Sequence, residues 1–127
     1  MSTNLVDKAQ SVIPSLMQDN RGDIKLKANQ IRKFLSAVTT LTNKVNRYKM
    51  KHPHEKTLPD DLAAQVQYLR VKMAYQAGRD KAVKDFVEKA QLDAVICGIK
   101  NSIETYEKFA RYMEALVAYH KYYGGKD

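Results

Sequence analysis

Residues 24–51 read IKLKANQIRKFLSAVTTLTNKVNRYKMK and carry the clearest helical period of the chain. With successive residues placed 100° apart, their apolar side chains fall on one face, as expected of a helix that packs one side against a core. The stretch therefore predicts a long amphipathic helix. Its apolar face comprises Ile24, Ile31, Phe34, Leu35, Val38, Leu41, Val45 and Tyr48.

The opposite face of this helix is basic, and no acidic residue interrupts it. A solvated helix face usually mixes charges of both signs, because oppositely charged pairs one turn apart stabilise the helix. Lys and Arg separated by short hydrogen-bonding side chains suit a phosphate backbone instead. We predict phosphate contacts here, with a plain solvated face as the alternative. The cations are Lys25, Arg32, Lys33, Lys44, Arg47 and Lys51, and Asn29, Ser36, Thr40 and Asn43 lie among them.

The charge of the chain is concentrated in the same region. The net charge is +8, and residues 23–57 hold nine Lys and Arg against two acidic residues. Residues 1–22 are neutral, and residues 58–127 carry only one excess positive charge. A localised basic excess is the electrostatic pattern expected of a protein with a polyanionic partner.

The rest of the chain also shows helical periods. With 127 residues, it is long enough to bury one core without disulfides, and five Gly and three Pro are too few for the turns of a β-sandwich. We predict an all-α compact bundle of about five helices, including one long C-terminal helix, as a single domain over residues 1–127. The further helices are expected at 4–17, interrupted at Pro14, and at 60–77, 80–90 and 92–123.

The boundaries follow from turn residues. Residues 20–22 and the proline-containing segment 52–59 are predicted to be loops. Gly78 is predicted to end the helix that starts at Asp60 as its C-cap. Gly98 lies inside the last predicted helix, where we attribute it to close packing rather than to a break.

Tyrosines outside the apolar stripes indicate a protein interface. Helix 60–77 is apolar on two sides, which is typical of a helix that is buried between neighbours or that serves an interface. Tyrosine is enriched at protein interfaces, and we favour that use over the stacking of nucleic-acid bases. The predicted interface residues are Tyr68 and Tyr75 on helix 60–77 and Tyr112, Tyr119 and Tyr123 on the last helix.

No pattern in the chain indicates catalysis. The sequence has no phosphate-binding loop, dinucleotide fingerprint, HExxH or CxxC pair. Cys97 is predicted to be a small core residue, and His120 a structural histidine at the rim of the core. His52 and His54 are too few for a metal site. We therefore expect no enzyme activity, cofactor or small-molecule substrate. Without a signal segment or an apolar run of about 18 residues, we also expect a cytosolic protein without a membrane partner.

Two stretches resemble a known family. Residues 68–90, YLRVKMAYQAGRDKAVKDFVEKA, and 109–127, FARYMEALVAYHKYYGGKD, closely resemble the small helical subunit of type III-A CRISPR interference (Csm) complexes, and span about a third of the chain. Length, basic charge and helical character also fit. His120 stands where the family pattern has an aromatic residue.

The resemblance implies a non-catalytic subunit of a cytoplasmic prokaryotic ribonucleoprotein in antiviral defence. Copies of such subunits stack head to tail into a minor filament beside the subunits that carry the CRISPR guide RNA, and hold the duplex of guide RNA and target RNA. Cleavage belongs to other subunits. Arg79, in the Gly78 turn of the resembling stretch, and Arg70 are further predicted RNA contacts; the alternative for Arg79 is a salt bridge to a helix end.

Two other classes of function remain open at this stage. One is a helical protein-interaction adaptor whose basic face is merely solvated. The other is a helix-turn-helix DNA-binding domain around Gly78, which we disfavour because Asp80, Asp85 and Glu88 in its second helix would repel DNA.

Overall fold

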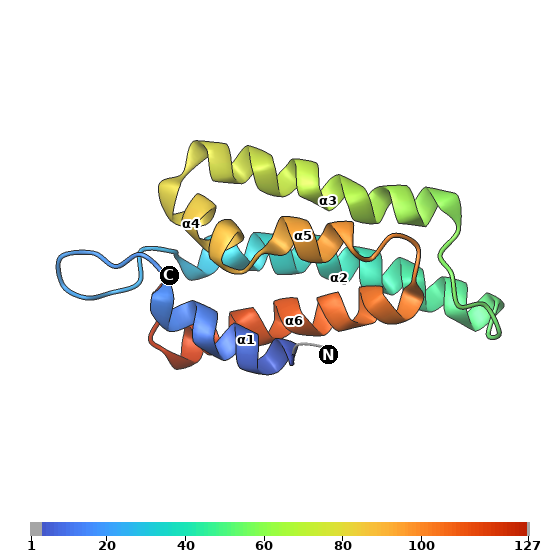
Figure 1. The fold of residues 1–127 in the computed structure, drawn as a ribbon, viewed down its shortest axis with the longest axis horizontal. Coiled ribbons are helices and arrows are strands. Elements are labelled where there is room, and N and C mark those ends of the chain that lie inside the picture. Colours follow the sequence, from blue (N-terminus) through green and yellow to red (C-terminus); the bar gives the residue numbers. More distant parts are fainter. Residues whose placement is uncertain (1–3, 127) are drawn as a thin grey trace.

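The computed structural model describes residues 4–126, which form six α-helices and one short 3-10 helix (Figure 1). This confirms the predicted all-α class, with a long C-terminal helix. Helix α2 is central and packs against both α3 and α6, while α1 covers α6, and α4 and α5 pack against α3. The elements are α1 (Leu5–Val12), η1 (Ile13–Ser15), α2 (Ala28–Lys51), α3 (Asp60–Arg79), α4 (Lys81–Lys89), α5 (Leu92–Cys97) and α6 (Ile103–Tyr122).

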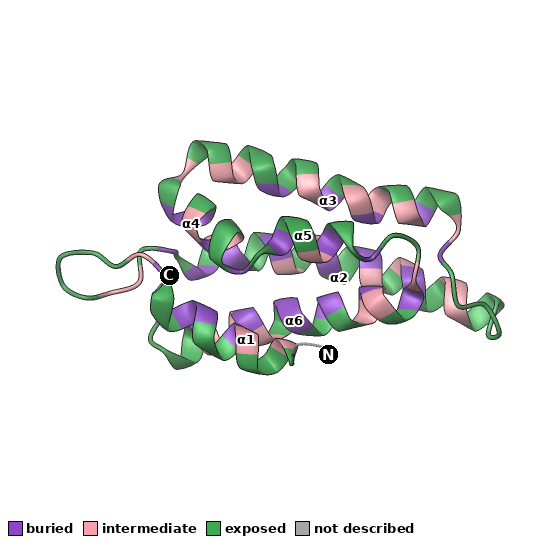
Figure 2. Cartoon of the chain, viewed as in Figure 1, coloured by how far each residue is buried: buried purple, intermediate pink, exposed green. Residues whose placement is uncertain are grey.

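The core is built from one face of each long helix, so that purple buried residues line the inner sides of the ribbons in Figure 2. On α2 the buried residues recur with the helical period that the sequence shows, which confirms its predicted apolar face. No helix of the described part of the chain is long and apolar enough to span a membrane. The buried residues of α2 are Ala28, Ile31, Phe34, Val38, Leu41 and Val45.

Helix α2 begins at Ala28, four residues later than the apolar period suggests. Ile24 pairs instead with Gln18 in an isolated antiparallel bridge. The C-terminal tail then caps the helix, because the Ala28 N–H donates to the Lys126 carbonyl over 2.7 Å. Lys25 consequently lies in the loop before α2 and not on its helical face.

The predicted helix 92–123 is two helices, so that expectation is wrong. Helix α5 ends at Cys97 and α6 begins at Ile103, after Lys100 has taken a left-handed φ of 52°. A Cβ on Gly98 would lie 3.5 and 3.6 Å from backbone oxygens, which is ordinary contact, so close packing does not explain this glycine. The turn pairs with the 52–59 loop, where the Leu58 N–H donates to the Asn101 carbonyl over 2.7 Å.

The boundary near Gly78 also differs from the prediction. Helix α3 continues through Gly78 to Arg79. Asp80 then ends α3 and caps α4, because its Oδ1 accepts from the N–H groups of Ala82 (2.8 Å) and Val83 (3.2 Å). Burial acts to raise the pKa of Asp80, but these hydrogen bonds outweigh it and hold the pKa below its usual value.

Three side chains of the C-terminal third lie elsewhere than predicted. Tyr112 is only 1% exposed and donates its hydroxyl to the Ala90 carbonyl over 2.8 Å, so it belongs to the core and not to a protein interface. Cys97 is exposed because it is the last residue of α5, and Ile96 fills the core position beside it. His120 is structural, as predicted, but it is buried rather than at the rim. Its Nε2 lies 2.7 Å from the Leu26 carbonyl oxygen.

Candidate nucleic-acid interface

The outward face of α2 carries five of the six cations predicted to contact phosphates. Because α2 is held between α3 and α6, this face has a fixed orientation over 24 residues, or about 36 Å at 1.5 Å per residue. Lys25 is exposed in the preceding loop. On α2 itself, Arg32, Lys33, Arg47 and Lys51 are exposed and Lys44 is half-buried.

Most of these cations are not neutralised by the fold. Lys44 donates from Nζ to Gln65 Oε1 over 2.8 Å, which is a neutral partner. No acidic residue occurs between Asp23 and Glu55 in the sequence, so α2 itself supplies no carboxylate. Four of the five predicted phosphate-contacting cations on α2 form no salt bridge within the described part of the chain: Lys33, Lys44, Arg47 and Lys51.

The C-terminal half of α2 gathers three of these cations. Lys44, Arg47 and Lys51 line an open cavity of about 550 Å³ between α2 and the start of α3, to which α3 contributes Asp61. Three positive charges against one carboxylate leave this part of the surface cationic. Such a surface attracts a polyanion without reading its sequence.

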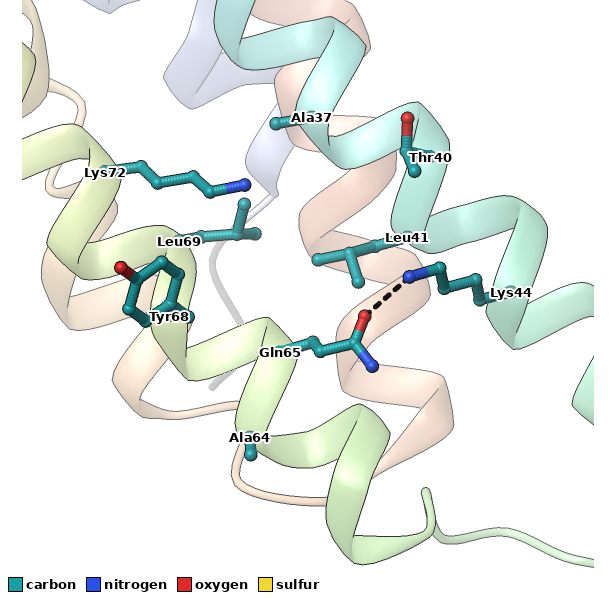
Figure 3. A pocket seen from close by; sticks show the side chains of 9 residues that line it. All are labelled: Ala37, Thr40, Leu41, Lys44, Ala64, Gln65, Tyr68, Leu69 and Lys72. Atoms are coloured by element: carbon teal, nitrogen blue, oxygen red, sulfur yellow. Dashed lines mark hydrogen bonds between the residues drawn. The ribbon is translucent and has the colours of Figure 1, made fainter.

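A groove between α2 and α3 adjoins the basic face. One cavity of about 410 Å³ has Ala37, Leu41 and Leu69 along its sides, with Lys44 and Lys72 near its opposite ends (Figure 3). A second cavity of about 400 Å³ adjoins it along α3 and adds Lys33. The sequence reasoning missed both this groove and Lys72, because the groove exists only once α2 and α3 lie side by side.

The two additional arginines have different surroundings. Arg70 points toward α5 and donates to Asp93 from two N–H groups on one edge of its guanidinium, with Nε–Oδ1 2.7 Å and Nη2–Oδ2 3.3 Å. The Arg70 hydrogen bond holds the pKa of Asp93 below its usual value. Arg79 lies over the Tyr75 ring and lines a cavity with Lys33 of α2. The structure therefore brings Arg79 to the basic face, and separates Arg70 from it.

The predicted interface tyrosines form two separate groups once Tyr112 is removed. Tyr68 and Tyr75 are 56% and 64% exposed on α3. Tyr119 and Tyr123 lie at the end of α6, where both pack against Tyr122, which is 76% exposed. The sequence reasoning did not single out Tyr122, although this residue belongs to the same tyrosine-rich C-terminal segment as Tyr119 and Tyr123.

The described residues contain no group of three His, Cys, Asp or Glu side chains that could hold a metal ion. His52 packs its ring against Tyr48, with 4.6 Å between the ring centroids. The candidate site consists of the cations of α2, neighbouring polar side chains and the groove beside the Tyr68 ring. Such a surface suits a ligand that carries both negative charge and aromatic rings.

Comparison with known proteins identifies the class of this bundle. The family model described as "Csm2 Type III-A" matches residues 2–126. A protein of Streptococcus thermophilus named "CRISPR system Cms protein Csm2" is 48% identical over 124 residues, which cover 98% of this chain and 94% of that protein. Proteins of the same name from Mycobacterium tuberculosis and Enterococcus italicus are 41% and 32% identical over 94% and 84% of this chain. Those matches cover 92% and 79% of the respective relatives.

These matches define a subunit of a type III-A CRISPR effector complex, with a structural rather than a catalytic role. The chain belongs to the Csm2 family of type III-A systems. The resemblance drawn from residues 68–90 and 109–127 is thereby confirmed.

Proposed function

We propose that this chain holds the duplex of guide RNA and target RNA in the effector complex through backbone contacts that do not depend on sequence. The outward face of α2 carries the proposal. It presents Lys33, Arg47 and Lys51 without a salt bridge in the described part of the chain, on a helix with no acidic residue. Sequence recognition is then left to base pairing between guide and target.

The fixed geometry of α2 favours an extended partner over a small anion. The cations on α2 are distributed from Arg32 in its second turn to Lys51 in its last turn, over about 28 Å. A single phosphate would meet at most one or two of them, whereas a nucleic-acid backbone passes several in succession. Lys25 and Arg32 belong to the same proposed surface, and Arg79 extends it toward α3. Arg70 is the weakest of the proposed contacts, because Asp93 occupies its guanidinium.

We further propose that copies of the chain stack head to tail beside the other subunits, in the cytoplasm of a prokaryotic cell. The exposed tyrosine cluster at the end of α6 supports this arrangement, since it lies at one end of the molecule and the 52–59 loop, which contains no tyrosine, lies at the other (Figure 1). A contact between two different surfaces of identical chains generates an open filament.

The test of backbone recognition compares unrelated sequences. The purified chain is titrated into two RNA duplexes of equal length and different sequence, and into a DNA duplex of the same length. We expect the two RNA affinities to agree within about twofold at ~50 mM salt, where phosphate contacts are strong. Absence of binding to all three would contradict RNA contact by the chain itself, and would favour the adaptor role in which the basic face is only solvated.

A further inference from the structure

Helix α3 repeats a pairing of tyrosine with a cation along its exposed side. The Lys72 Nζ lies 5.9 Å from the centroid of the Tyr68 ring, and the Arg79 Cζ lies 5.5 Å from that of Tyr75. In each pair the cation follows the tyrosine by four residues, and the two tyrosines are seven residues apart. Both rings are more than half exposed, so the core does not require them.

The Tyr68 pair lies against the groove between α2 and α3. Tyr68 and Lys72 line both of its cavities, and Tyr75 lines the second. The sides include Ala37, Leu41 and Leu69, while α2 supplies Lys44 and Lys33 (Figure 3). No carboxylate lines either cavity. The groove thus offers an aromatic ring beside apolar sides, with cations on both helices.

Gln65 adds a polar group to the lining of the first cavity. Its Oε1 accepts from Lys44, and its side-chain N–H₂ group has no hydrogen-bond partner in the described part of the chain. An amide donor is thereby left for an acceptor that enters the groove.

We propose that this groove binds an unpaired RNA base, which stacks on Tyr68 while Lys44 and Lys72 contact the flanking phosphates. The proposal rests on RNA contact by the α2 face and adds a second mode of contact to it. For Tyr68, base stacking replaces the protein-interface role that the sequence favoured, because cations and no carboxylate line the groove beside this ring. Aromatic side chains stack bases of any sequence, and single-stranded RNA is typically bound by such rings within a cationic groove. A fully paired duplex keeps its bases inside the helix, so only an unpaired nucleotide can enter.

A second copy of this chain fits the groove less well. Each copy carries a net charge of +8, so a copy placed on a cationic groove without carboxylates meets repulsion. An RNA strand brings one negative phosphate for every base and neutralises the same cations. The charge therefore favours a nucleotide over a copy of the chain as the occupant.

The experiment compares three RNA duplexes that share one sequence: a fully paired duplex, the same duplex with one bulged nucleotide, and that bulge without its base. The full-length chain is expected to bind the bulged duplex more tightly than the other two. Tyr68→Ala is expected to abolish this preference, a loss of about 5- to 150-fold in affinity for the bulged duplex, as for removal of one stacking ring. Tyr68→Phe keeps the ring and is expected to keep the preference.

Val6→Ala is the control, since Val6 is a half-exposed apolar residue on α1 that lines neither cavity. The thermal unfolding midpoint of each variant shows that it folds. Equal binding of the three duplexes by the wild-type chain, no binding of the bulged duplex at ~50 mM salt, or an unchanged preference in Tyr68→Ala would overturn the proposal. Failure of this proposal alone leaves paired-duplex binding and its sensitivity to Arg47→Glu intact, whereas failure of the proposed function removes both.

Discussion

Replacing Lys33, Arg47 and Lys51 together by glutamate is expected to reduce the affinity for a paired RNA duplex by about 100-fold at low salt. Each cation near a phosphate contributes roughly 1 kcal/mol in water, and three such contributions amount to about two orders of magnitude in the dissociation constant. The three side chains are exposed and form no salt bridge in the described part of the chain, so the fold should tolerate the change. Fluorescence anisotropy with a labelled duplex measures the effect.

The matched control reverses the same number of charges away from α2. Lys84, Lys100 and Lys121 are exposed and lie outside the basic face, so their replacement by glutamate changes the net charge equally. We expect this control to lose much less affinity than the α2 variant. Equal losses in the two triple variants would mean that total charge, and not the α2 face, attracts RNA.

The second large effect is on stability. Tyr112→Ala is expected to lower the free energy of unfolding by about 3–5 kcal/mol, as for other large aromatic residues removed from a core. Tyr112 is 1% exposed, and its hydroxyl donates to the Ala90 carbonyl, which connects α6 to the end of α4. Burial also raises the pKa of Tyr112 above its ordinary value, so the hydroxyl stays protonated as a donor. Urea denaturation measures the change.

Tyr122→Ala serves as the stability control in the isolated chain, because an exposed tyrosine should change the free energy of unfolding by less than about 0.5 kcal/mol. A Tyr112→Ala protein as stable as the wild type would contradict the buried position of this ring. The result also matters for assembly experiments. A variant at Tyr112 that fails to join the complex would report unfolding and not the loss of an interface contact.

Local periodicity explains why so much of α2 could be predicted. Its apolar face and its lack of acidic residues are properties of one continuous segment, and they require no knowledge of the neighbouring helices. The kink at Pro14 was equally local: α1 ends at Val12, and Pro14 lies in the short 3-10 helix that follows. The family resemblance likewise rests on short contiguous stretches.

The break between α5 and α6 was harder to predict, because the apolar period continues through it. The turn is held by hydrogen bonds from the 52–59 loop, more than 40 residues away, as between Leu58 and Asn101. A local signal was nevertheless present. Ser102 accepts from the Thr105 N–H over 3.1 Å, and a serine followed by Glu104 in the first turn is typical of a helix start.

The burial of Tyr112 and the exposure of Cys97 depend on which neighbours surround each helix. Helix α6 contacts α1, α2 and α5, so its buried arc is wider than the single apolar stripe of its sequence. Helix α5 is only six residues long, and its last residue is left outside the core. The groove beside Tyr68 needed the same three-dimensional information, although the repeated spacing of Tyr68 with Lys72 and Tyr75 with Arg79 was visible in the sequence.

The salt dependence of binding shows whether the basic face of α2 contacts an RNA backbone. For three to five phosphate contacts, the logarithm of the association constant is expected to fall with the logarithm of salt concentration at a slope of roughly −2 to −4.5. The Arg47→Glu, Lys51→Glu double variant should flatten that slope by roughly 1.4–1.8. A slope near zero for the wild-type chain, or the same slope in both proteins, would contradict contact between the basic face of α2 and the RNA backbone.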